Sequence, residues 1–379
     1  MINLPKLLLT ADTYYPKVDG TLKFMEEFIK RSQQTFEITL LVPFLGKKQG
    51  ENVIYLEPSK RINLSGYPLM KLSLRNFNKI KKTVKDSDII FVQGPALISY
   101  LSIYYGFKYQ KRTVFYTHTI AWELFEQFAP PLLNKIAYNI VKRFSIFFYN
   151  HCNEILVPYE ELKLELRRSG VRTKITVAKL GVDIDIFSPD ENKSYWKSKI
   201  GLPADKKVIG YVGRISREKN INVLFNAFKK LKDKDLQLLL VGDGPEEQKK
   251  SFKTINNCKI TGFVDNVQDY LKAMDIFVMP SLTETTSLVT LEAMATGLPV
   301  ITSKIGFIKT YINKGKNGLF FPKNSARILA AKIIKLLEDQ EQQGRLGRNA
   351  RKTVAYIFSW ERSINRIKKL LLAGYYHHK

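Results

Sequence analysis

Short apolar runs rich in β-branched residues alternate with amphipathic runs along almost the whole chain. This alternation is typical of parallel sheets whose strands are joined by crossover helices. In the first half of the chain the predicted strands are 6–10, 37–42, 88–92, 113–117 and 154–157. In the second half they are 208–212, 236–241, 259–262, 276–279, 300–302 and 318–321. Two such series predict an α/β protein with two doubly wound, Rossmann-like domains.

A polar, turn-prone stretch separates the two series. It contains Ser-Pro-Asp-Glu-Asn at 188–192, which places a domain boundary near residue 190. After Pro322 the pattern is purely helical, over 326–337, 341–357 and 360–372. The predicted domains are therefore 1–190 and 191–358, followed by a helix over 359–379 that could cross back onto the first domain. We expect the two domains to leave a central cleft where the carboxyl ends of both sheets face each other. Ligands bind outside these strand ends in such folds, so the chemistry is expected there.

The charge balance indicates an anionic partner. The chain has 61 Lys and Arg residues against 35 Asp and Glu residues, a formal charge of +26. This excess indicates nucleic acid, an anionic membrane or a phosphorylated substrate. Between Glu57 and Asp86 there is no acidic residue, and eight basic residues are interleaved with aromatic and aliphatic ones. Such a stretch suits docking on anionic lipid, although a solvated charged face has the same composition.

Two features bear on the compartment. Cys152 and Cys258 are the two cysteines, and they form neither a disulfide framework nor a metal-ligand spacing. We therefore expect a reducing, cytoplasmic setting, and the opening MINLPKLLLTAD is interpreted as a first strand rather than a signal peptide. Segment 89–107 has 19 uncharged residues, enough for a membrane span. Gln93-Gly94-Pro95 interrupts it, however, and predicts a strand followed by a helix.

The segment PSLTETTSLVTLEAMATGLPV, residues 280–300, places Glu284 and Glu292 eight residues apart. A helix is predicted over 285–296, with Gly297 as its stop. Eight helical residues span about 12 Å, whereas carboxylates that cleave a glycosidic bond lie about 5 to 9.5 Å apart. The pair is thus better suited to hold two hydroxyl-bearing parts of one extended ligand, with the helix N-terminus offering N–H groups to a phosphate. The structural alternative is a loop glutamate near the helix start and a solvated helix glutamate.

Further candidates lie where other predicted strands end. Arg214 and Lys219 follow the strand that ends at Gly213, and two cations there can neutralise a diphosphate. Gly242 opens a tight Gly-Asp-Gly-Pro turn after the next strand, which permits close backbone approach to a ligand. The dinucleotide and P-loop fingerprints are absent from the sequence.

The first domain offers two candidates. Loop 11–21 leads from the first strand into a helix, and Gly20 would let backbone N–H groups approach an anion. His118, one of four histidines, directly follows the predicted strand 113–117. A lone histidine is more often structural, but one at the carboxyl end of a strand facing a crevice is a site candidate. Neither a Ser/His/Asp nor a Cys/His signature accompanies it.

Taken together, the segments GYVGRISREKN, LLLVGDGP, ITGFV, MPSLTETTSLVTLEAMATGLPVI and LGVDIDIF resemble the retaining glycosyltransferases of family 4, which have the GT-B fold. The resemblance implies that Arg214 and Lys219 hold the donor diphosphate. It implies that Glu284 contacts the donor sugar and Glu292 the nucleotide ribose. By the same resemblance Gly20 lies under the phosphates and His118 near the sugar's 6-hydroxyl. The other expected substrate-binding residues are Thr21, Gly213, Gly242, Ser287, Leu288 and Val289.

The resemblance also implies a mechanism. The family is thought to use a same-face substitution in which the leaving phosphate oxygen accepts the proton of the acceptor, so that no protein nucleophile is needed. We expect no cofactor and no metal. Asp183 and Asp185, and Asp86 and Asp88, have D-x-D spacing, but the metal-binding D-x-D belongs to a different glycosyltransferase fold.

One departure bears on the substrates. Thr285-Thr286-Ser287 stands where the family usually has glycine-rich sequence. The Glu-Thr beginning is similar to enzymes that glycosylate diacylglycerol lipids, but Ser287 replaces their glycine, which could narrow the pocket or alter the sugar accepted. We predict hexose transfer from a UDP- or GDP-sugar to a lipid or lipid-linked acceptor, with the enzyme peripheral on the inner face of the membrane. The alternatives are a soluble sugar or glycan acceptor and, from another class, a basic nucleic-acid-binding protein. A recognised nucleic-acid module is missing.

Overall fold

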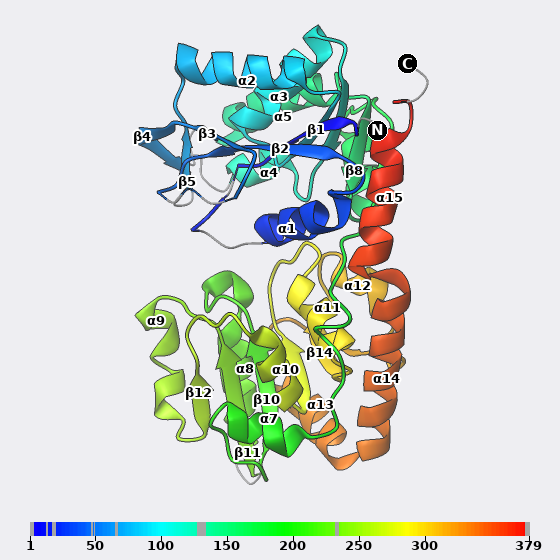
Figure 1. Cartoon of the computed structure of the whole chain (residues 1–379). Helices are drawn as coiled ribbons and strands as arrows, with labels where there is room; N and C mark the ends of the chain where they lie inside the picture. Colours follow the sequence, from blue (N-terminus) through cyan, green and yellow to red (C-terminus); the bar gives the residue numbers. More distant parts are fainter. Residues whose placement is uncertain are drawn as a thin grey trace. The chain divides into compact units, whose positions relative to one another are not determined.

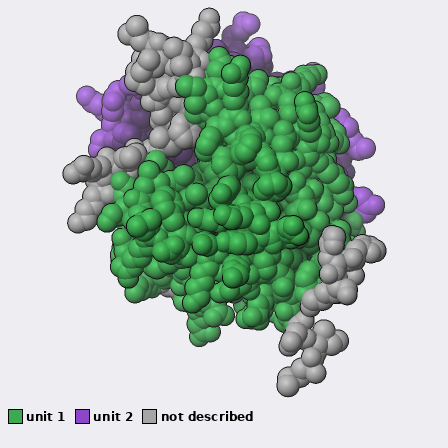
Figure 2. All heavy atoms as spheres, turned by 90° about the horizontal axis from the view of Figure 1, so that it is seen from above, with its two compact units in different colours: residues 1–179, 361–379 green, residues 180–360 purple. Residues whose placement is uncertain are grey.

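The computed structural model describes residues 4–12, 14–16, 20–46, 48, 50–64, 67–126, 134–231 and 235–375. It divides into two compact units, Met1–Lys179 with Glu361–Lys379 and Leu180–Trp360 (Figures 1 and 2). Each unit is built on one parallel sheet. The predicted pair of Rossmann-like sheets is therefore confirmed.

The sheet of unit 1 has seven strands in the order β3-β2-β1-β6-β7-β8-β9. Its strands are β1 (Lys6–Thr10), β2 (Glu37–Pro43), β3 (Val53–Leu56), β6 (Ile89–Gln93), β7 (Arg112–Tyr116), β8 (Glu154–Val157) and β9 (Ile175–Val177). A separate antiparallel hairpin pairs β4 (Pro58–Leu64) with β5 (Tyr67–Met70). The edge strands β3 and β9 and this hairpin are additions to the predicted set. The runs of β3 and β9, VIYL and ITV, are only four and three residues long, which is too short for a clear pattern. Both strands of the hairpin, PSKRINL and YPLM, contain a proline, which argues against a central strand.

Helices cover both faces of this sheet (Figure 1). On one face α2 (Leu74–Asp86), α3 (Leu97–Lys108) and α5 (Asn134–Tyr149) share a core with the strands. On the other, Phe24 and Phe28 of α1 (Gly20–Ser32) pack against Phe91, with ring centroids 6.3 and 5.2 Å apart. The unit also contains α4 (Ala121–Glu126) and α6 (Glu160–Arg168).

The uncharged segment 89–107 forms β6 and most of α3, as the interruption at Gln93-Gly94-Pro95 predicts. Among the residues that the structure describes, there is no helix with the length and apolar character needed to cross a membrane.

The sheet of unit 2 has six strands in the order β12-β11-β10-β13-β14-β15. They are β10 (Lys207–Val212), β11 (Leu236–Val241), β12 (Cys258–Ile260), β13 (Ile276–Met279), β14 (Val300–Ser303) and β15 (Leu319–Phe321). All six lie within two residues of the predicted ranges. The helices of the unit are α7 (Lys193–Lys199), α8 (Ile221–Phe228), α9 (Glu246–Lys249), α10 (Val267–Ala273), α11 (Leu288–Ala295), α12 (Ile308–Tyr311), α13 (Ala326–Glu338) and α14 (Gln340–Ile357).

The division between the units falls at Lys179 and Leu180, earlier than the predicted residue 190. The reason is that the segment after Leu180 is tied to the helical end of unit 2. Val182 N–H donates to Phe358 O at 2.7 Å, and one guanidinium nitrogen of Arg351 donates to Ile184 O and Phe187 O, each at 2.8 Å. A turn-prone sequence predicts a surface segment. It does not predict to which domain that segment is hydrogen-bonded.

The final helix, α15 (Trp360–Leu372), belongs almost entirely to unit 1. Arg112 donates to Leu370 O at 2.6 Å and to Leu371 O at 2.8 Å, and so holds the carboxyl end of the helix at the start of β7. Lys368 Nζ donates to Arg31 O at 3.1 Å, next to the end of α1. The chain therefore closes unit 1 with its last helix.

Candidate active site

Two of the predicted site residues meet where strands β10 and β13 end. Lys219 closes a short 3-10 turn, Arg217–Lys219, in the loop after β10, and Glu284 lies in the loop after β13. Lys219 Nζ lies 2.7 Å from Glu284 Oε1, and the two side chains are only 20% and 10% exposed. Parallel strands bring their carboxyl ends to one edge of the sheet, which is why residues 65 positions apart can pair.

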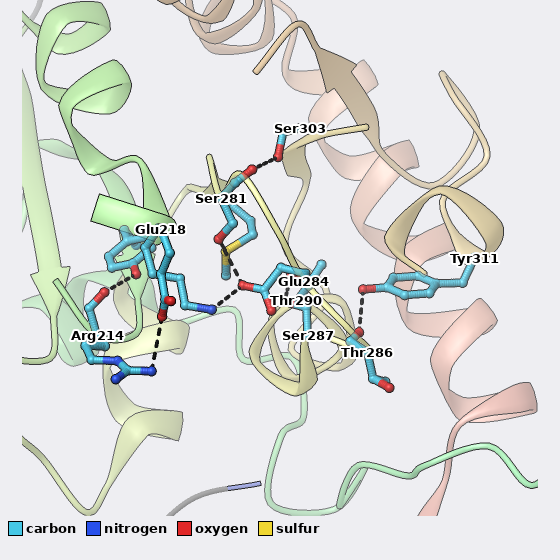
Figure 3. Close-up of polar contacts among 12 residues, drawn as sticks. Arg214, Glu218, Ser281, Glu284, Thr286, Ser287, Thr290, Ser303 and Tyr311 are labelled. Carbon is cyan, nitrogen blue, oxygen red and sulfur yellow. Dashed lines mark hydrogen bonds and ion pairs between the residues drawn. The ribbon is translucent and has the colours of Figure 1, made fainter. Parts of the chain in front are cut away.

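The serines of two neighbouring strand ends fix the Glu284 carboxylate (Figure 3). Ser281 Oγ donates to Glu284 Oε1 at 2.9 Å, and Ser303 Oγ, at the end of β14, donates to Ser281 O at 2.6 Å. Both serines are fully buried. Sequence reasoning missed these two residues, because a serine at a strand end carries no signal of its own.

Residues that follow β14 hydrogen-bond to the backbone of the loop from Glu284 to Ser287. Phe307 N–H donates to Thr285 O at 3.3 Å, and the buried Tyr311 hydroxyl donates to Thr286 O at 3.1 Å. Gly306, with φ +47°, lies so close that a Cβ atom there would be 1.8 Å from Glu284 O. The position of Glu284 thus depends on a glycine and a tyrosine that the sequence analysis does not single out.

The predicted helix over 285–296 is shorter in the structure, where α11 begins at Leu288. Ser287 adopts a left-handed conformation, φ 52° and ψ 71°, and the carbonyls of Thr285 and Thr286 bind residues after β14 instead of extending the helix. The estimate of about 12 Å between the two glutamates assumed continuous helix. It therefore does not apply to this segment.

Ser287 occupies a backbone conformation that glycine adopts most easily. Its Oγ lies 2.8 Å from Thr290 Oγ1, and the residue is 7% exposed. A left-handed conformation costs a non-glycine residue about 1–2 kcal/mol, which the hydroxyl pair partly offsets. The serine that departs from the family pattern is therefore held in a glycine-like geometry, and the expected binding residues Leu288 and Val289 follow it as the first two residues of α11.

Substitution of Ser287 should reveal this strain. We expect Ser287→Val to lower the free energy of unfolding by about 2–3 kcal/mol, because a β-branched residue is a conformational outlier at this φ and the hydroxyl pair is lost. Ser287→Gly is the matched control and should change it by less than about 1 kcal/mol, since relief of strain offsets the lost pair. Urea denaturation of both variants measures the difference. Equal losses would show that the conformation is not strained.

Glu292 does not occupy a solvated helix position. It lies in the middle of α11 and is 6% exposed. A carboxylate is rarely buried to this extent without a structural or binding reason. The structural alternative considered from the sequence is therefore wrong for Glu292.

Arg214 differs from Lys219 in being open to solvent. Its side chain is 70% exposed, and Nη2 lies 3.1 Å from Glu218 Oε1, which is itself half exposed. The backbone beneath it is fixed, because the buried Tyr211 hydroxyl donates to Arg214 O at 2.8 Å. Burial, with the Glu284 charge adding to it, raises the pKa of Tyr211, so the phenol remains a donor. The Arg214 side chain thus stands on a fixed backbone, and its guanidinium is exposed to solvent and paired with a half-exposed carboxylate.

The glycines of the site are required by packing between loops of this chain. Gly213 and Gly242 have φ of +144° and +133°. A Cβ atom on Gly242 would lie 2.1 Å from Gly213 O, and one on Gly244 would lie 1.9 Å from Ile215 O. The turns after β10 and β11 therefore touch each other directly, which accounts for Gly242 whether or not a ligand approaches it.

In unit 1 the predicted residues again lie after strands or at a helix start. Gly20 and Thr21 are the first two residues of α1. His118 follows β7, with its ring centroid 4.4 Å from that of Tyr116 and 6.1 Å from that of Phe24. Burial lowers the pKa of His118 to about 4, and neither ring nitrogen has a hydrogen-bond partner within the described part of the chain. A neutral imidazole with both nitrogens available suits a hydroxyl ligand better than a phosphate.

Asp12, directly after β1, is a titratable group that the sequence analysis does not select. Burial raises its pKa to about 8, and the backbone N–H of Ala96, which donates to the carboxylate, opposes part of this rise. Thr13 and residues 17–19 of the same loop lie outside the described residues. At neutral pH the side chain is therefore largely protonated and can donate a hydrogen bond.

The D-x-D pairs serve the backbone. Asp183 Oδ1 accepts from the N–H groups of Asp185 and Ile186, each at 3.1 Å, and Asp88 Oδ2 accepts from Lys6 N–H at 2.8 Å. Among the described residues there is no group of three or more His, Cys, Asp or Glu side chains that could hold a metal ion.

Comparisons with known proteins place this geometry in context. Residues 192–353 match the family described as "Glycosyl transferases group 1", and residues 18–186 match "Glycosyltransferase Family 4". The chain is 25% identical over 370 residues to the alpha-monoglucosyldiacylglycerol synthase of Acholeplasma laidlawii, covering 90% of both proteins. It is 26% identical over 334 residues to the Streptococcus pneumoniae protein of the same name, covering 83% of this chain and 74% of that protein.

A solved structure with the same architecture is that of HepE from Anabaena in complex with UDP-glucose. The TM-score is 0.77 at 18% identity, and the match covers 97% of this chain and 100% of that chain. At this identity the likeness concerns the fold. Together with the two parallel sheets it shows the GT-B fold predicted from the sequence.

Proposed function

The chain belongs to the family 4 glycosyltransferases, and we propose that it transfers a hexose, with retention of configuration, from a UDP- or GDP-linked sugar to a lipid or lipid-linked acceptor at a membrane surface. The observation that carries the proposal is the Lys219–Glu284 pair beside the exposed Arg214, at one edge of the sheet of unit 2. This edge combines two cations for a diphosphate with a carboxylate for sugar hydroxyls.

In this proposal Arg214 and Lys219 bind the donor diphosphate and stabilise the negative charge that develops on it as the glycosidic bond breaks. Preorganised charges of this kind are often the largest single contribution to catalysis. The pairing with Glu284 holds the Lys219 ammonium in place before the donor arrives. The ordered Glu284 carboxylate can accept additional hydrogen bonds from the sugar.

The remaining roles complete a donor site. Glu292, buried in α11, binds the ribose, and the backbone N–H groups of Ser287, Leu288 and Val289 approach the phosphates. For unit 1 we propose substrate-binding roles for Gly20 and Thr21 at the start of α1 and for the neutral His118, which can accept or donate a hydrogen bond to a sugar hydroxyl. The leaving phosphate oxygen takes the proton of the acceptor, so we propose neither a protein nucleophile nor a metal cofactor.

Three observations favour a lipid acceptor. Two relatives that match more than four fifths of this chain are named alpha-monoglucosyldiacylglycerol synthase. The chain also carries a formal charge of +26, which favours an anionic membrane over a neutral soluble sugar. The Glu-Thr start of the loop at Glu284 is similar to enzymes of that type.

A panel of UDP- and GDP-sugars tests the proposal. Each sugar is scored for hydrolysis and for the rise in unfolding temperature that binding to the native state causes, with diacylglycerol, glucosyldiacylglycerol and free disaccharides as acceptors. We expect one nucleotide class to stabilise the protein and transfer to a lipid acceptor to exceed transfer to any soluble sugar. Transfer to soluble sugars alone would support the glycan alternative. Tight, salt-sensitive nucleic-acid binding without turnover would support the other class.

A further inference from the structure

An apolar patch lies on the outer side of the helix layer of unit 1. On α5, Ile140, Phe144 and Phe147 recur at i, i+4 and i+7, so they share one face of the helix. Their exposed fractions are 62%, 46% and 57%. On the adjoining α3, Tyr104 and Phe107 are 44% and 58% exposed. We call these five residues the α3–α5 patch.

The patch is continuous across the two helices. The His151 ring lies with its centroid 4.4 Å from that of Phe107 and 4.4 Å from that of Phe147, and so joins α3 to the end of α5. Tyr100 of α3 contacts Phe144 at 5.1 Å in an edge-to-face arrangement. Large apolar side chains gathered on one exposed surface are unusual and mark a binding surface for an apolar partner.

The charge around the patch is strongly one-sided. Helix α2, which packs beside α3, has five basic residues, α3 has one and α5 has three, whereas the only acidic residue in the three helices is Asp86. Lys108 and Arg143 are exposed beside the patch, and Lys81, Lys82 and Lys85 are exposed on α2. An anionic partner is therefore attracted to this layer much more strongly than a zwitterionic one.

These features discriminate among partners. A second copy of the chain would bring the same positive charge against itself, which disfavours a symmetric interface. Nucleic acid would meet the basic residues, but it offers no apolar phase for the aliphatic Ile140 and for rings at a helical spacing. An anionic bilayer satisfies both, since aromatic and aliphatic groups enter the headgroup boundary while Lys and Arg bind the phosphates.

We propose that the α3–α5 patch, with the exposed basic residues of α2 around it, docks unit 1 on a bilayer that contains anionic lipid. The inference rests on the proposed function, because a lipid acceptor requires the enzyme to reach its membrane. It also changes the expectation for residues 57–86. Ile80 and Val84 of α2 are buried in the core, and the exposed apolar side chains of this segment are Leu72 and Leu74 at its start, 65% and 80% exposed. The rest of α2 therefore supplies charge, and the larger apolar surface is that of the neighbouring helices.

Vesicle sedimentation tests the apolar contact. The double variant Phe107→Gln/Phe147→Gln removes two half-exposed rings without entering the core. We expect its apparent affinity for phosphatidylcholine vesicles with about a third phosphatidylglycerol to fall by at least about tenfold. The control Leu164→Gln removes a 46% exposed leucine from α6 and should leave the affinity unchanged. Equal binding by the double variant and the wild type would overturn the proposal.

The charge contribution is tested separately. Lys81→Gln/Lys82→Gln/Lys85→Gln should weaken binding by about fivefold or more for each lysine near the surface and reduce its dependence on salt. Vesicles of phosphatidylcholine alone should bind the wild-type protein weakly. If the ring substitutions instead abolish a concentration-dependent dimer, or single-stranded DNA binding, while vesicle binding persists, the patch belongs to that partner and the proposal is wrong.

Hydrolysis of the nucleotide sugar without vesicles separates the two proposals. The Phe107→Gln/Phe147→Gln variant should hydrolyse the donor at the wild-type rate, because both rings lie outside the proposed donor site. A protein that binds vesicles through the patch but turns over no nucleotide sugar would contradict the proposed function and leave the docking surface intact. Normal turnover together with vesicle binding that does not depend on the patch would support the proposed function and contradict the docking surface.

Discussion

Arg214→Ala is expected to lower sugar transfer by about a hundred- to a thousandfold, the usual effect of removing one preorganised group that stabilises developing negative charge. The fold should persist. The Arg214 side chain is 70% exposed, and its ion pair with the half-exposed Glu218 belongs to a class that contributes only about 0–1 kcal/mol. We therefore expect the unfolding temperature to change by no more than about 2–4 °C.

A neighbouring arginine provides the control. Arg217 lies on the same loop, is 81% exposed and forms a comparable surface ion pair with Glu247. Arg217→Ala removes the same charge and should retain transfer within about threefold of wild type, since charges on the surface are screened at physiological salt. Initial rates at saturating donor, with thermal unfolding of each variant, decide the matter. Unchanged transfer by Arg214→Ala, or equal losses in both variants, would remove Arg214 from the site.

Arg214→Lys tests the forked geometry. Lysine keeps the charge but cannot form two parallel hydrogen bonds to a phosphate. Partial activity in this variant would indicate that charge is the main requirement. Activity as low as that of Arg214→Ala would indicate that the forked hydrogen-bond geometry is the main requirement.

The parts of the fold that were predictable are those with a continuous pattern. The central strands are predominantly apolar runs, such as β13 (IFVM) with every residue buried, and both sheets follow from these runs. The pairing of Glu284 with Lys219 also follows in outline, because both come after parallel strands and the carboxyl ends of such strands share an edge. The carboxylates could be ruled out as an acid/base pair only through an assumption of helix that the structure does not support.

What could not be predicted depends on contacts between distant segments. Ser303 lies 22 residues from Ser281, and the two are linked by a single hydrogen bond. The boundary at Leu180 is set by Arg351, far along the chain. The burial of Glu292 depends on how α11 packs, because a single charged residue in the otherwise apolar helix LVTLEAMA could equally lie on an exposed side. Local propensity contains none of this information.

Gly306→Ala should have the second large effect, although residue 306 contacts no proposed substrate group through its side chain. A Cβ atom there would be 1.8 Å from Glu284 O and 3.0 Å from Glu284 C, and these are backbone atoms that cannot rotate away. The loop that bears Glu284 must therefore move. Because positioning errors of about 1 Å can cost a hundredfold in rate, we expect transfer to fall by about that factor.

The backbone conformation must be separated from the collision, and Gly315 allows this. It has a φ of +77°, also in the left-handed region, but a Cβ atom there would meet nothing within 4 Å. Gly315→Ala should cost about 1–2 kcal/mol from the conformation alone and retain donor binding and transfer. Gly306→Ala should lose more stability than this and also lose the thermal stabilisation by the donor nucleotide sugar. If the two variants behave alike, the contact between Gly306 and the backbone of Glu284 does not position the carboxylate, and the loop has freedom that its hydrogen bonds to Phe307 and Tyr311 do not suggest.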